Sequence, residues 1–288
     1  MNDQAEKLRN RLKQNNFENE AKTIAVVSGK GGVGKSNFSL NFSISLARKG
    51  HRILLFDLDI GMGNIEILMG RTSPYSIADY LSGKSSIEEV IFQGPEGVEY
   101  ISGGTGLSQL IRMDQHAVHQ FIFSLGELLK KYDYIVFDMG AGLSEETLSI
   151  LLSVSEIFVI TTTEPTSLMD AYATMKHIHK ADSSLPFYLV VNRAGSVKEG
   201  NETMSRLEDV LGKFLGRSPI KLGILPDDRS VKEAVKRQIP FVMYNERSQV
   251  SKGMAAIVDK YINKITYGAE KRENRSFTSR FRQFLFER

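Results

Sequence analysis

One short segment of the sequence combines the residue types that bind phosphate. It reads Gly29-Lys-Gly-Gly-Val-Gly-Lys-Ser36, fits the pattern G-x-x-x-x-G-K-[ST], and follows an apolar, β-branched run at 23–28. Glycines let backbone N–H groups close around phosphate oxygens, and a helix that begins near Lys35 adds positive potential. We expect Lys35 to reach the β and γ phosphates of a nucleotide and Ser36 to ligate Mg²⁺. The residues expected to bind the nucleotide here are Gly29, Lys30, Gly31, Gly32, Val33, Gly34, Lys35, Ser36 and Asn37.

Carboxylates end two further apolar runs. Asp57 ends the run at 52–57 and is followed by Asp59, and Asp138 ends the run at 134–138 before a glycine-rich turn. Ligands of open parallel sheets bind at the carboxyl ends of the strands, so we expect these side chains near the phosphate loop. Asp138 suits a carboxylate that holds Mg²⁺, and Asp57 or Asp59 can orient water or complete the metal shell. The alternative is that Asp57 and Asp59 only cap backbone N–H groups.

A third group of polar residues follows the last apolar runs. Asn192 ends the run at 187–192 and precedes Arg193, and Pro226-Asp227 follows the run at 220–225. A side-chain amide can donate to and accept from the edge of an adenine base. On the residues alone, however, Asn192 is better explained as a residue of a turn at the strand end.

The elements that must position these residues alternate between two types. Apolar runs occur at 23–28, 52–57, 98–102, 134–138, 157–161, 187–192 and 220–225, and amphipathic stretches occur at 116–131, 168–180, 202–215 and about 248–265. Such alternation requires crossover connections. It predicts an α/β fold with a mostly parallel sheet of seven or eight strands, flanked by helices. The 288 residues, 41% of them hydrophobic, are enough for one large domain.

Composition excludes several classes of protein. There is no cysteine, which excludes a disulfide framework, a thiolate zinc site, a cysteine nucleophile and an iron–sulfur cluster held by cysteines. The N-terminus is polar and no apolar stretch is long enough for a spanning helix, which predicts neither a signal peptide nor a membrane span. The net charge is +3. Residues 269–288 carry an excess of basic residues equal to that of the whole chain, so the remainder is formally neutral.

The basic tail has the pattern of a short amphipathic helix. Phe277, Phe281, Phe284 and Leu285 fall on one helical face, and Ser276 can cap the helix at its start. A helix over 276–287 is marginal alone in water, so it needs a surface that accepts its apolar face. Anionic lipid would also attract its arginines. The alternatives are a helix docked on its own domain and a disordered tail.

The loop Lys30-Gly-Gly-Val-Gly-Lys35 resembles the deviant phosphate loop of the MinD/ParA family of dimerising ATPases, and the resemblance extends from about residue 21 to 265. It implies a MinD-like P-loop NTPase of the SIMIBI class that uses ATP, ADP and Mg²⁺ and forms a homodimer with ATP. Lys30 would reach the partner's phosphates and act in catalysis with Lys35 and Asp59, where Asp59 positions the attacking water. Further implied roles fall on Asp57 at the metal and nucleotide, on Asp138 and Ser36 at the metal, and on Asn192, Arg193, Pro226 and Asp227 around the adenine.

The two ends of the chain carry further resemblances. The tail is similar to the membrane-targeting helices of MinD-like proteins. The N-terminal string Asp3-Gln-Ala-Glu-Lys-Leu-Arg9 is similar to the first helix of the FlhG family (also called YlxH or FleN) of flagellar number regulators. In that family this segment stimulates the SRP-type GTPase FlhF, which assigns Asp3, Gln4, Leu8 and Arg9 to a GTPase-activating segment.

These resemblances imply three regions and one cellular role. Residues 1–20 would activate a partner, 21–267 would form the ATPase domain, and 268–288 would form a linker and a membrane-targeting helix. The protein would be cytoplasmic, and peripheral on the inner face of the cell membrane when bound to ATP. It would control flagellar number and placement, with FlhF and the flagellar switch (C-ring) proteins as partners and no specific nucleic acid.

Other members of the superfamily leave alternatives. Nitrogenase iron protein and iron–sulfur carriers need cysteine, and arsenite pump ATPases carry two phosphate loops where this chain has one. A MinD-type division-site regulator and a ParA-type DNA segregation ATPase remain, although the latter needs basic residues over its surface. A nucleotide-binding scaffold whose hydrolysis is incidental also remains.

Overall fold

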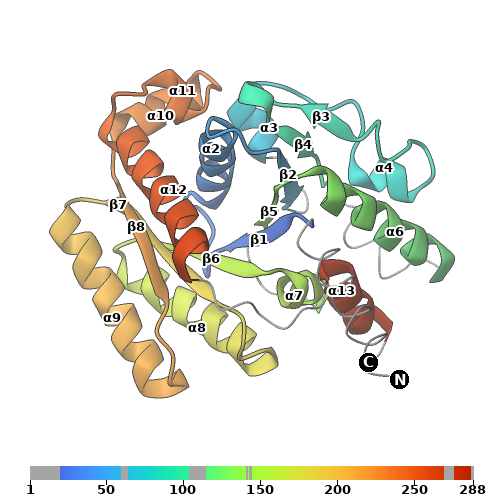
Figure 1. Ribbon diagram of the computed structural model, residues 1–288. Helices are drawn as coiled ribbons and strands as arrows, with labels where there is room; N and C mark the ends of the chain where they lie inside the picture. The colour runs from blue at the N-terminus through green and yellow to red at the C-terminus, as the bar shows by residue number, and fades with distance from the viewer. Residues whose placement is uncertain are drawn as a thin grey trace.

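The computed structural model describes residues 20–59, 64–103, 115–140, 142, 145–268 and 276–286. Within this part of the chain, an eight-stranded sheet runs through the molecule in the order β3-β4-β2-β5-β1-β6-β7-β8 (Figure 1). The strands are β1 (Lys22–Val27), β2 (Ile53–Leu58), β3 (Ile91–Gln93), β4 (Glu99–Ile101), β5 (Tyr134–Met139), β6 (Glu156–Thr161), β7 (Phe187–Ala194) and β8 (Ile220–Pro226). Neighbouring strands pair in parallel, except for β3, which runs antiparallel to β4. The prediction of a mostly parallel sheet of seven or eight strands is confirmed.

The central strands are apolar along most of their length because helices cover both faces of the sheet. β2, β5 and β6 are buried at every position, as expected for parallel strands between two helical layers. The edge strand β3 has only three residues.

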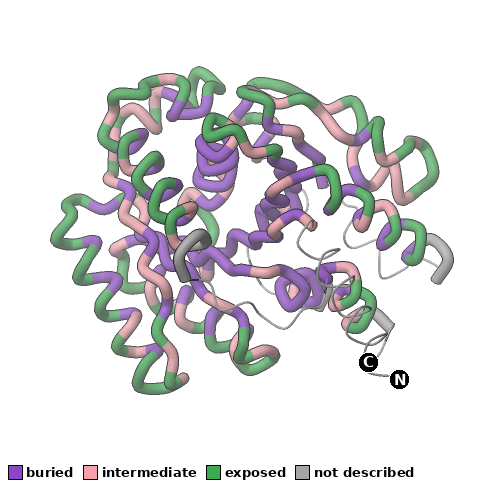
Figure 2. The backbone as a smooth tube through the Cα atoms, viewed as in Figure 1, coloured by how far each residue is buried: buried purple, intermediate pink, exposed green. Residues whose placement is uncertain are grey.

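Helices form one layer on each face of the sheet (Figure 1). One layer consists of α2 (Lys35–Ala47), α3 (Asn64–Met69), α10 (Arg229–Lys236), α11 (Phe241–Tyr244) and α12 (Gln249–Gly268). The other consists of α4 (Ile77–Leu81), α6 (Gln115–Lys131), α7 (Glu145–Ser153), α8 (Pro165–Ala181), α9 (Val197–Leu215) and α13 (Phe277–Phe286), and a 3₁₀ turn at Pro95–Gly97 precedes β4. Each layer encloses its own apolar core, so burial is concentrated at the sheet and along the inner faces of the helices (Figure 2).

The order of the strands creates a crevice at the carboxyl end of β1. β1 lies between β5 and β6, and the chain leaves β1 for β2 on one side and later returns to β6 on the other. Connections that diverge in this way leave space beyond the strand ends, which is where open α/β sheets bind their ligands. The phosphate loop follows β1 directly and therefore opens into this crevice.

The C-terminal helix α13 lies on the domain itself. Phe277 and Phe281 are buried, Phe277 stacks on Phe137 of β5 with ring centroids 5.5 Å apart, and the Arg280 Nε donates to the Ser153 carbonyl at 2.9 Å. Ser276 accepts a hydrogen bond from the Ser279 N–H at 3.1 Å and caps the helix as expected.

The apolar face that the sequence assigns to a membrane therefore meets protein in this conformation. Phe284 packs against the same core from a partly buried position, and Leu285 belongs to the same helix. The physical reason is that α6, α7 and β5 leave an apolar gap that an amphipathic helix fills. None of the helices in the described ranges is both long enough and apolar enough to cross a membrane.

Candidate nucleotide-binding site

The phosphate loop joins β1 to α2 and ends in a left-handed turn. Gly32 and Gly34 have φ angles of 78° and 90°, which L side chains rarely adopt. Gly34 is the N-cap of α2 and has no side chain with which to cap it. The first N–H groups of α2 therefore remain available to an anion, and the helix dipole favours negative charge at the same place. Ser36 and Asn37 belong to this first turn, where Asn37 accepts a hydrogen bond from the Asn41 side chain.

Lys35 and Asp138 form a buried ion pair beneath the loop. The Lys35 Nζ lies 3.3 Å from the Asp138 Oδ1, and the Ser39 Oγ donates to the same oxygen at 2.9 Å. Burial raises the pKa of Asp138, while Lys35, Ser36 and Ser39 oppose that increase. The second carboxylate oxygen of Asp138, Oδ2, is buried and has no hydrogen-bond partner in the described part of the chain. One oxygen of Asp138 is thus held in place and the other is free for a ligand.

Asp57 lies beside Asp138 on the neighbouring strand. The two residues are paired in the register of β2 and β5. Burial, and secondly the negative charge of Asp138, raises the pKa of Asp57 to about 7. Its Oδ1 accepts a hydrogen bond from the Asp59 N–H at 3.0 Å, whereas its Oδ2 is buried without a partner among the described residues.

These two free carboxylate oxygens fit a divalent cation. Mg²⁺ prefers oxygen ligands and is usually held by one or two carboxylates together with substrate phosphates. Within the described ranges no group of three or more His, Asp or Glu side chains forms a metal cage. Asp57, Asp138 and the hydroxyl of Ser36 would therefore hold Mg²⁺ together with a nucleotide rather than alone.

Asp59 lies where two loops of the crevice meet. It is half-buried, and its Oδ2 accepts a hydrogen bond from the Asn64 Nδ2 at 3.1 Å. A Cβ atom added to Gly140, in the turn after β5, would lie 3.2 Å from the Asp59 Oδ1. The absence of a side chain at position 140 therefore allows the carboxylate of Asp59 to approach the turn that follows Asp138.

Lys30 points away from the buried pair. Its side chain is 46% exposed and lies 3.2 Å from the carboxylate of Glu164, which is itself 62% exposed. The structure therefore separates the two lysines of the loop: Lys35 lies inside the crevice and Lys30 at its outer rim. An exposed ion pair of this kind contributes little to stability and can exchange partners at little cost.

Asn192 and Arg193 contact the phosphate loop directly. The Asn192 Nδ2 donates to the Val33 carbonyl at 2.8 Å, and its Oδ1 accepts from the Arg193 N–H at 2.9 Å. The Arg193 guanidinium donates to the Gly32 carbonyl at 3.2 Å. A Cβ atom on Gly34 would lie only 2.5 Å from the Asn192 Nδ2, which explains why a glycine is needed there. In this conformation the amide of Asn192 supports the loop, and it would need new partners to contact a base.

The end of β8 completes this edge of the crevice. Pro226 pairs with Ala194 in the register of β7 and β8, and the Asp227 N–H donates to the Ala194 carbonyl at 2.9 Å. The structure thus brings Pro226 and Asp227 next to the Asn192–Ala194 segment. Asp3, Gln4, Leu8 and Arg9 lie outside the described residues.

Sequence reasoning missed two residues close to these carboxylates. Ser39 lies one helical turn after Lys35, and the i, i+4 spacing in α2 is a signal that could have found it. Tyr100 lies in β4, is completely buried, and has Asp57 as the charge that acts on it most strongly. No local pattern distinguishes this tyrosine from an ordinary core residue.

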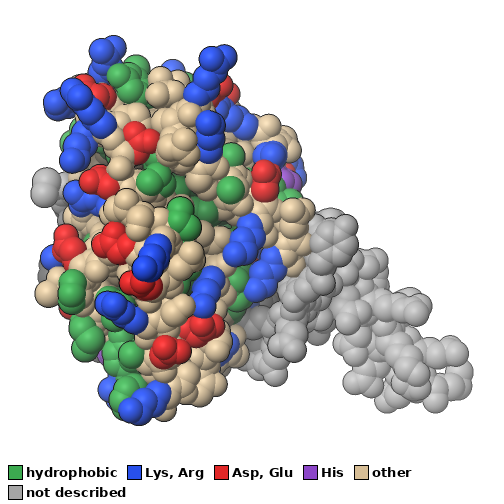
Figure 3. Space-filling model, turned by 90° about the vertical axis from the view of Figure 1, so that its left-hand side faces the viewer, with side chains coloured by type: hydrophobic (Ala, Val, Ile, Leu, Met, Phe, Trp, Pro, Cys, Tyr) green, Lys and Arg blue, Asp and Glu red, His purple; other side chains and the backbone are tan. Residues whose placement is uncertain are grey.

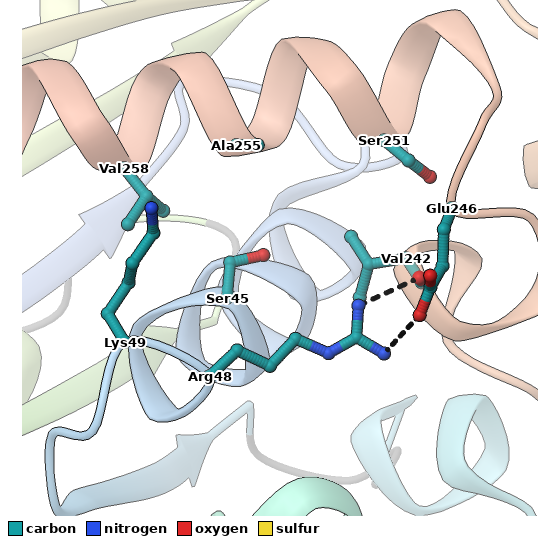
Figure 4. Close-up of a pocket in the computed structure, with 8 residues that line it drawn as sticks. All are labelled: Ser45, Arg48, Lys49, Val242, Glu246, Ser251, Ala255 and Val258. Carbon is teal, nitrogen blue, oxygen red and sulfur yellow. Dashed lines mark hydrogen bonds and ion pairs between the residues drawn. The ribbon is translucent and has the colours of Figure 1, made fainter.

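A separate cavity of about 150 Å³ lies at the other end of α2, between α2, α11 and α12 (Figure 4). It is lined by Ser45, Arg48, Lys49, Val242, Glu246, Ser251, Ala255 and Val258. Arg48 is paired with Glu246 at 3.0 Å, and Lys49 with Asp259 at 2.6 Å. Because these cations are already paired, the cavity does not compete with the crevice as a site for phosphate.

The chain is similar in sequence to several known proteins. The model of the ParA family, described as NUBPL iron-transfer P-loop NTPase, matches residues 19–262. The antiactivator FleN of Pseudomonas aeruginosa is 32% identical over 251 residues, which is 86% of this chain and 89% of that protein. The flagellum site-determining protein YlxH of Helicobacter pylori is 31% identical over 293 residues, or 99% of both chains.

A solved structure has a similar fold. The septum site-determining protein MinD of Pyrococcus horikoshii, complexed with Mg-ADP, superposes with a TM-score of 0.69 at 27% identity, covering 86% of this chain and 98% of that one. This chain therefore shares its fold with a protein that was solved with Mg-ADP.

Proposed function

We propose that this chain, which belongs to the ParA/MinD family of P-loop NTPases, is an Mg²⁺-dependent ATPase that works as a dimerising switch. The observation that carries the proposal is the pair of buried carboxylates, Asp57 and Asp138, each with one free oxygen, beside Lys35 at the phosphate loop. Iron transfer, which the family description mentions, is not part of the proposal because the chain contains no cysteine.

The residues of the crevice have different roles in hydrolysis. Lys35 lies inside the crevice, 3.3 Å from Asp138, where it can exchange part of that contact for the β and γ phosphates of ATP. Asp57, Asp138 and the Ser36 hydroxyl would hold Mg²⁺, which would supply positive charge against the phosphates. Asp59, held by Asn64 and placed against Gly140, accepts a hydrogen bond from the attacking water and orients it. Catalysis here consists of positioning and electrostatic stabilisation.

Dimerisation would use Lys30. Its exposed position at the rim, where it pairs with Glu164, supports a role toward phosphates of a second copy rather than toward its own. Exchange of Glu164 for phosphate would couple nucleotide binding to dimer formation. Hydrolysis removes the γ phosphate and with it the partner of Lys30, so the dimer would separate.

The cellular role we propose is control of flagellar number and placement. The relatives FleN and YlxH have names that refer to antiactivation and to the flagellum site, and the match to YlxH extends over 99% of this chain. The proposed partners are the GTPase FlhF, stimulated through the segment that contains Asp3, Gln4, Leu8 and Arg9, and the flagellar switch (C-ring) proteins.

Membrane association through α13 would require a change of conformation. The side chains of Phe277 and Phe281 are 3% and 2% exposed, so they cannot contact lipid while the helix is docked. Undocking exposes apolar surface at a cost of roughly 1.5–3 kcal/mol per phenylalanine. Two helices on one dimer would offset this cost by avidity, and binding of the protein to the inner face of the cell membrane would then follow ATP.

The membrane proposal has a direct test. Deletion of 269–288 should abolish flotation with vesicles of anionic phospholipid while binding of fluorescent ADP is retained, because the phosphate loop leads into α2, which packs on the opposite face of the sheet from α13. Flotation of the truncated protein at the level of the full chain would contradict the role of the tail.

A division-site role remains the second candidate because the MinD of Pyrococcus horikoshii has the same fold and a similar length. A DNA segregation role has less support. The face in Figure 3 carries basic side chains interspersed with acidic ones, which is not the continuous basic surface that DNA backbone binding needs.

Hydrolysis is tested by phosphate release from ATP with and without Mg²⁺. We expect Asp59→Asn to lower kcat by about 100-fold while nucleotide affinity stays within about threefold, since this change removes only the group that orients water. The same variant should accumulate ATP dimers in light scattering. Hydrolysis by Asp59→Asn at the wild-type rate would contradict the assignment.

The cellular role is tested by microscopy of cells that lack the gene. Flagellar number and position, minicells and anucleate cells are scored side by side. Altered flagellation with normal division supports the proposed role, minicells would favour the division-site role, and anucleate cells would favour DNA segregation.

A further inference from the structure

The buried tyrosine Tyr100 has an unsatisfied hydroxyl. It lies in β4, its side chain is completely buried, and its OH has no hydrogen-bond partner among the residues that the structure describes. A phenylalanine would fill the same space without burying a hydroxyl, so this oxygen is unexplained by packing.

The strand register places Tyr100 close to Asp57. Tyr100 pairs with Leu55 on β2, and Asp57 is two residues further along on the same face of the sheet. Diagonal neighbours of this kind are within reach of a tyrosine side chain. The end of β4 also closes on this residue, because a Cβ atom on Gly103 would lie 1.9 Å from the Asp57 carbonyl oxygen.

The groups around the phenol leave it as a donor. A tyrosine hydroxyl is protonated at neutral pH and can donate one hydrogen bond. The Ser102 hydroxyl is also near the phenol but does not satisfy it with a hydrogen bond of normal geometry. Glu66 already accepts a hydrogen bond from the Ser73 N–H at 2.8 Å.

The Tyr100 O–H thus lacks an acceptor and lies near the Asp57 Oδ2, which lacks a donor. The Asp57 Oδ2 is buried and has no partner in the described ranges, and Asp57 is one of the residues that we assign to the Mg²⁺ shell. A carboxylate that must present one oxygen to a ligand gains precision when a second group fixes its orientation.

We propose that Tyr100 is a positioning residue. Its O–H donates, in the nucleotide-bound state and directly or through one water, to one lone pair of the Asp57 Oδ2, and so orients the other lone pair of this oxygen toward the metal and phosphates. The inference rests on the proposed Mg²⁺-dependent nucleotide site. It adds to that site a residue from β4, a strand that contributes none of the residues expected from the sequence.

The test is a double-mutant cycle of Tyr100→Phe and Asp57→Asn. Binding of fluorescent ADP is titrated with Mg²⁺, starting from protein in EDTA, which gives the half-saturating Mg²⁺ concentration without any need for turnover. The matched control is Tyr261→Phe, which removes the hydroxyl of another completely buried tyrosine, one that bonds to Glu156 at the opposite edge of the sheet.

We expect Tyr100→Phe to raise the half-saturating Mg²⁺ concentration about tenfold in the wild-type background and less than about twofold in Asp57→Asn. Its midpoint of thermal unfolding without ligand should not fall, because the variant removes an unsatisfied group. Tyr261→Phe should lower the unfolding midpoint by about 3 °C and leave the Mg²⁺ titration unchanged.

Three results would overturn the inference. Tyr100→Phe could raise the half-saturating Mg²⁺ concentration by less than about twofold, it could raise it by the same factor in the Asp57→Asn background as in the wild type, or Tyr261→Phe could raise it as much as Tyr100→Phe does. A wild-type protein that binds fluorescent ADP with Mg²⁺ but does not hydrolyse ATP would contradict only the proposed hydrolysis. A wild-type protein that binds no nucleotide would overturn both.

Discussion

Buried carboxylates lie at both ends of the strands of this sheet, Glu156 at the amino ends and Asp57 and Asp138 at the carboxyl ends. At the amino end of β6, Glu156 accepts hydrogen bonds from Tyr188 at 2.9 Å and Tyr261 at 2.5 Å and pairs with Lys22 at 2.6 Å. At the carboxyl edge, Asp57 and Asp138 each keep one buried oxygen without a partner in the described part of the chain. Burial is nearly equal, since Glu156 is 3% exposed and the two aspartates 1% and 0%.

The two sites differ in how fully their carboxylates are hydrogen-bonded, and this difference corresponds to a role in stability at one and in ligand binding at the other. Glu156 is surrounded by donors, and its charge helps to keep the two phenols protonated by raising their pKa values. This cluster ties α12 to the sheet. The pair of aspartates is kept incomplete, which costs stability when no ligand is present and leaves coordination sites for one. We therefore expect changes at one edge to affect unfolding and changes at the other to affect nucleotide binding.

The largest effects are expected when the lysine beside each group of carboxylates is replaced by alanine. Lys35→Ala should lower nucleotide affinity at least ~100-fold, since Lys35 is the buried cation that would meet the phosphates. Isothermal titration with ADP and Mg²⁺ measures this loss. The matched variant Lys22→Ala should leave affinity unchanged but lower the free energy of unfolding by about 2–3 kcal/mol, because Glu156 loses its counter-charge. Equal effects of both variants on nucleotide affinity would remove the distinction between the edges.

Asp57→Asn should change how stability depends on pH. The folded protein raises the pKa of Asp57 from 3.8 to about 7, so it binds a proton more tightly than the unfolded chain does. The stabilising contribution is complete below the unfolded pKa and is lost as pH rises through the folded pKa. In EDTA and without nucleotide, the wild-type free energy of unfolding should fall ~2 kcal/mol more between pH 5 and 7 than that of Asp57→Asn.

Urea denaturation at several pH values measures this difference, and Glu156→Gln is the control variant at the other edge. A wild-type protein whose pH profile is parallel to that of Asp57→Asn would show that the carboxylate is not destabilised by its site.

Tyr261→Phe tests whether the hydrogen bonds to Glu156 stabilise the fold. The variant leaves Glu156 with one donor fewer, and we expect the free energy of unfolding to fall by about 1.5 kcal/mol, as for a hydrogen bond to a charged group. Fluorescence-monitored denaturation measures the change, with nucleotide affinity as the internal control. An unchanged unfolding midpoint would mean that the cluster does not stabilise the fold.

Lys30→Ala should have the smallest effect on stability. Its ion pair with Glu164 is exposed, so the free energy of unfolding should change by less than ~0.5 kcal/mol. If Lys30 acts across a dimer, light scattering should nevertheless show no dimer with ATP. Glu164→Gln is the matched variant, which removes the partner of Lys30 but keeps the lysine, and it should retain the dimer. A dimer of Lys30→Ala at the wild-type level would refute the role of this lysine.

Local spacing in the sequence is enough to predict part of the site. The phosphate loop, with Lys35 and Ser36, is recognisable because its glycines and lysine occur within eight positions between a strand and a helix. Asp57 and Asp138 were predicted because each ends an apolar run, and the register of β2 and β5 then brings them together. The parallel sheet follows from the same alternation of apolar and amphipathic segments.

Contacts between distant segments cannot be predicted from local spacing and are seen in the folded chain. Glu156 and Tyr261 are 105 positions apart, and Lys35 and Ser39 reach Asp138 across 103 and 99. Tyr100 shows no signal at all in its own strand. Whether the apolar face of α13 meets lipid or protein was likewise undetermined, because periodicity shows that a helix has an apolar face and does not show what covers it. Packing supplies that answer, since it depends on which surfaces the rest of the chain leaves exposed.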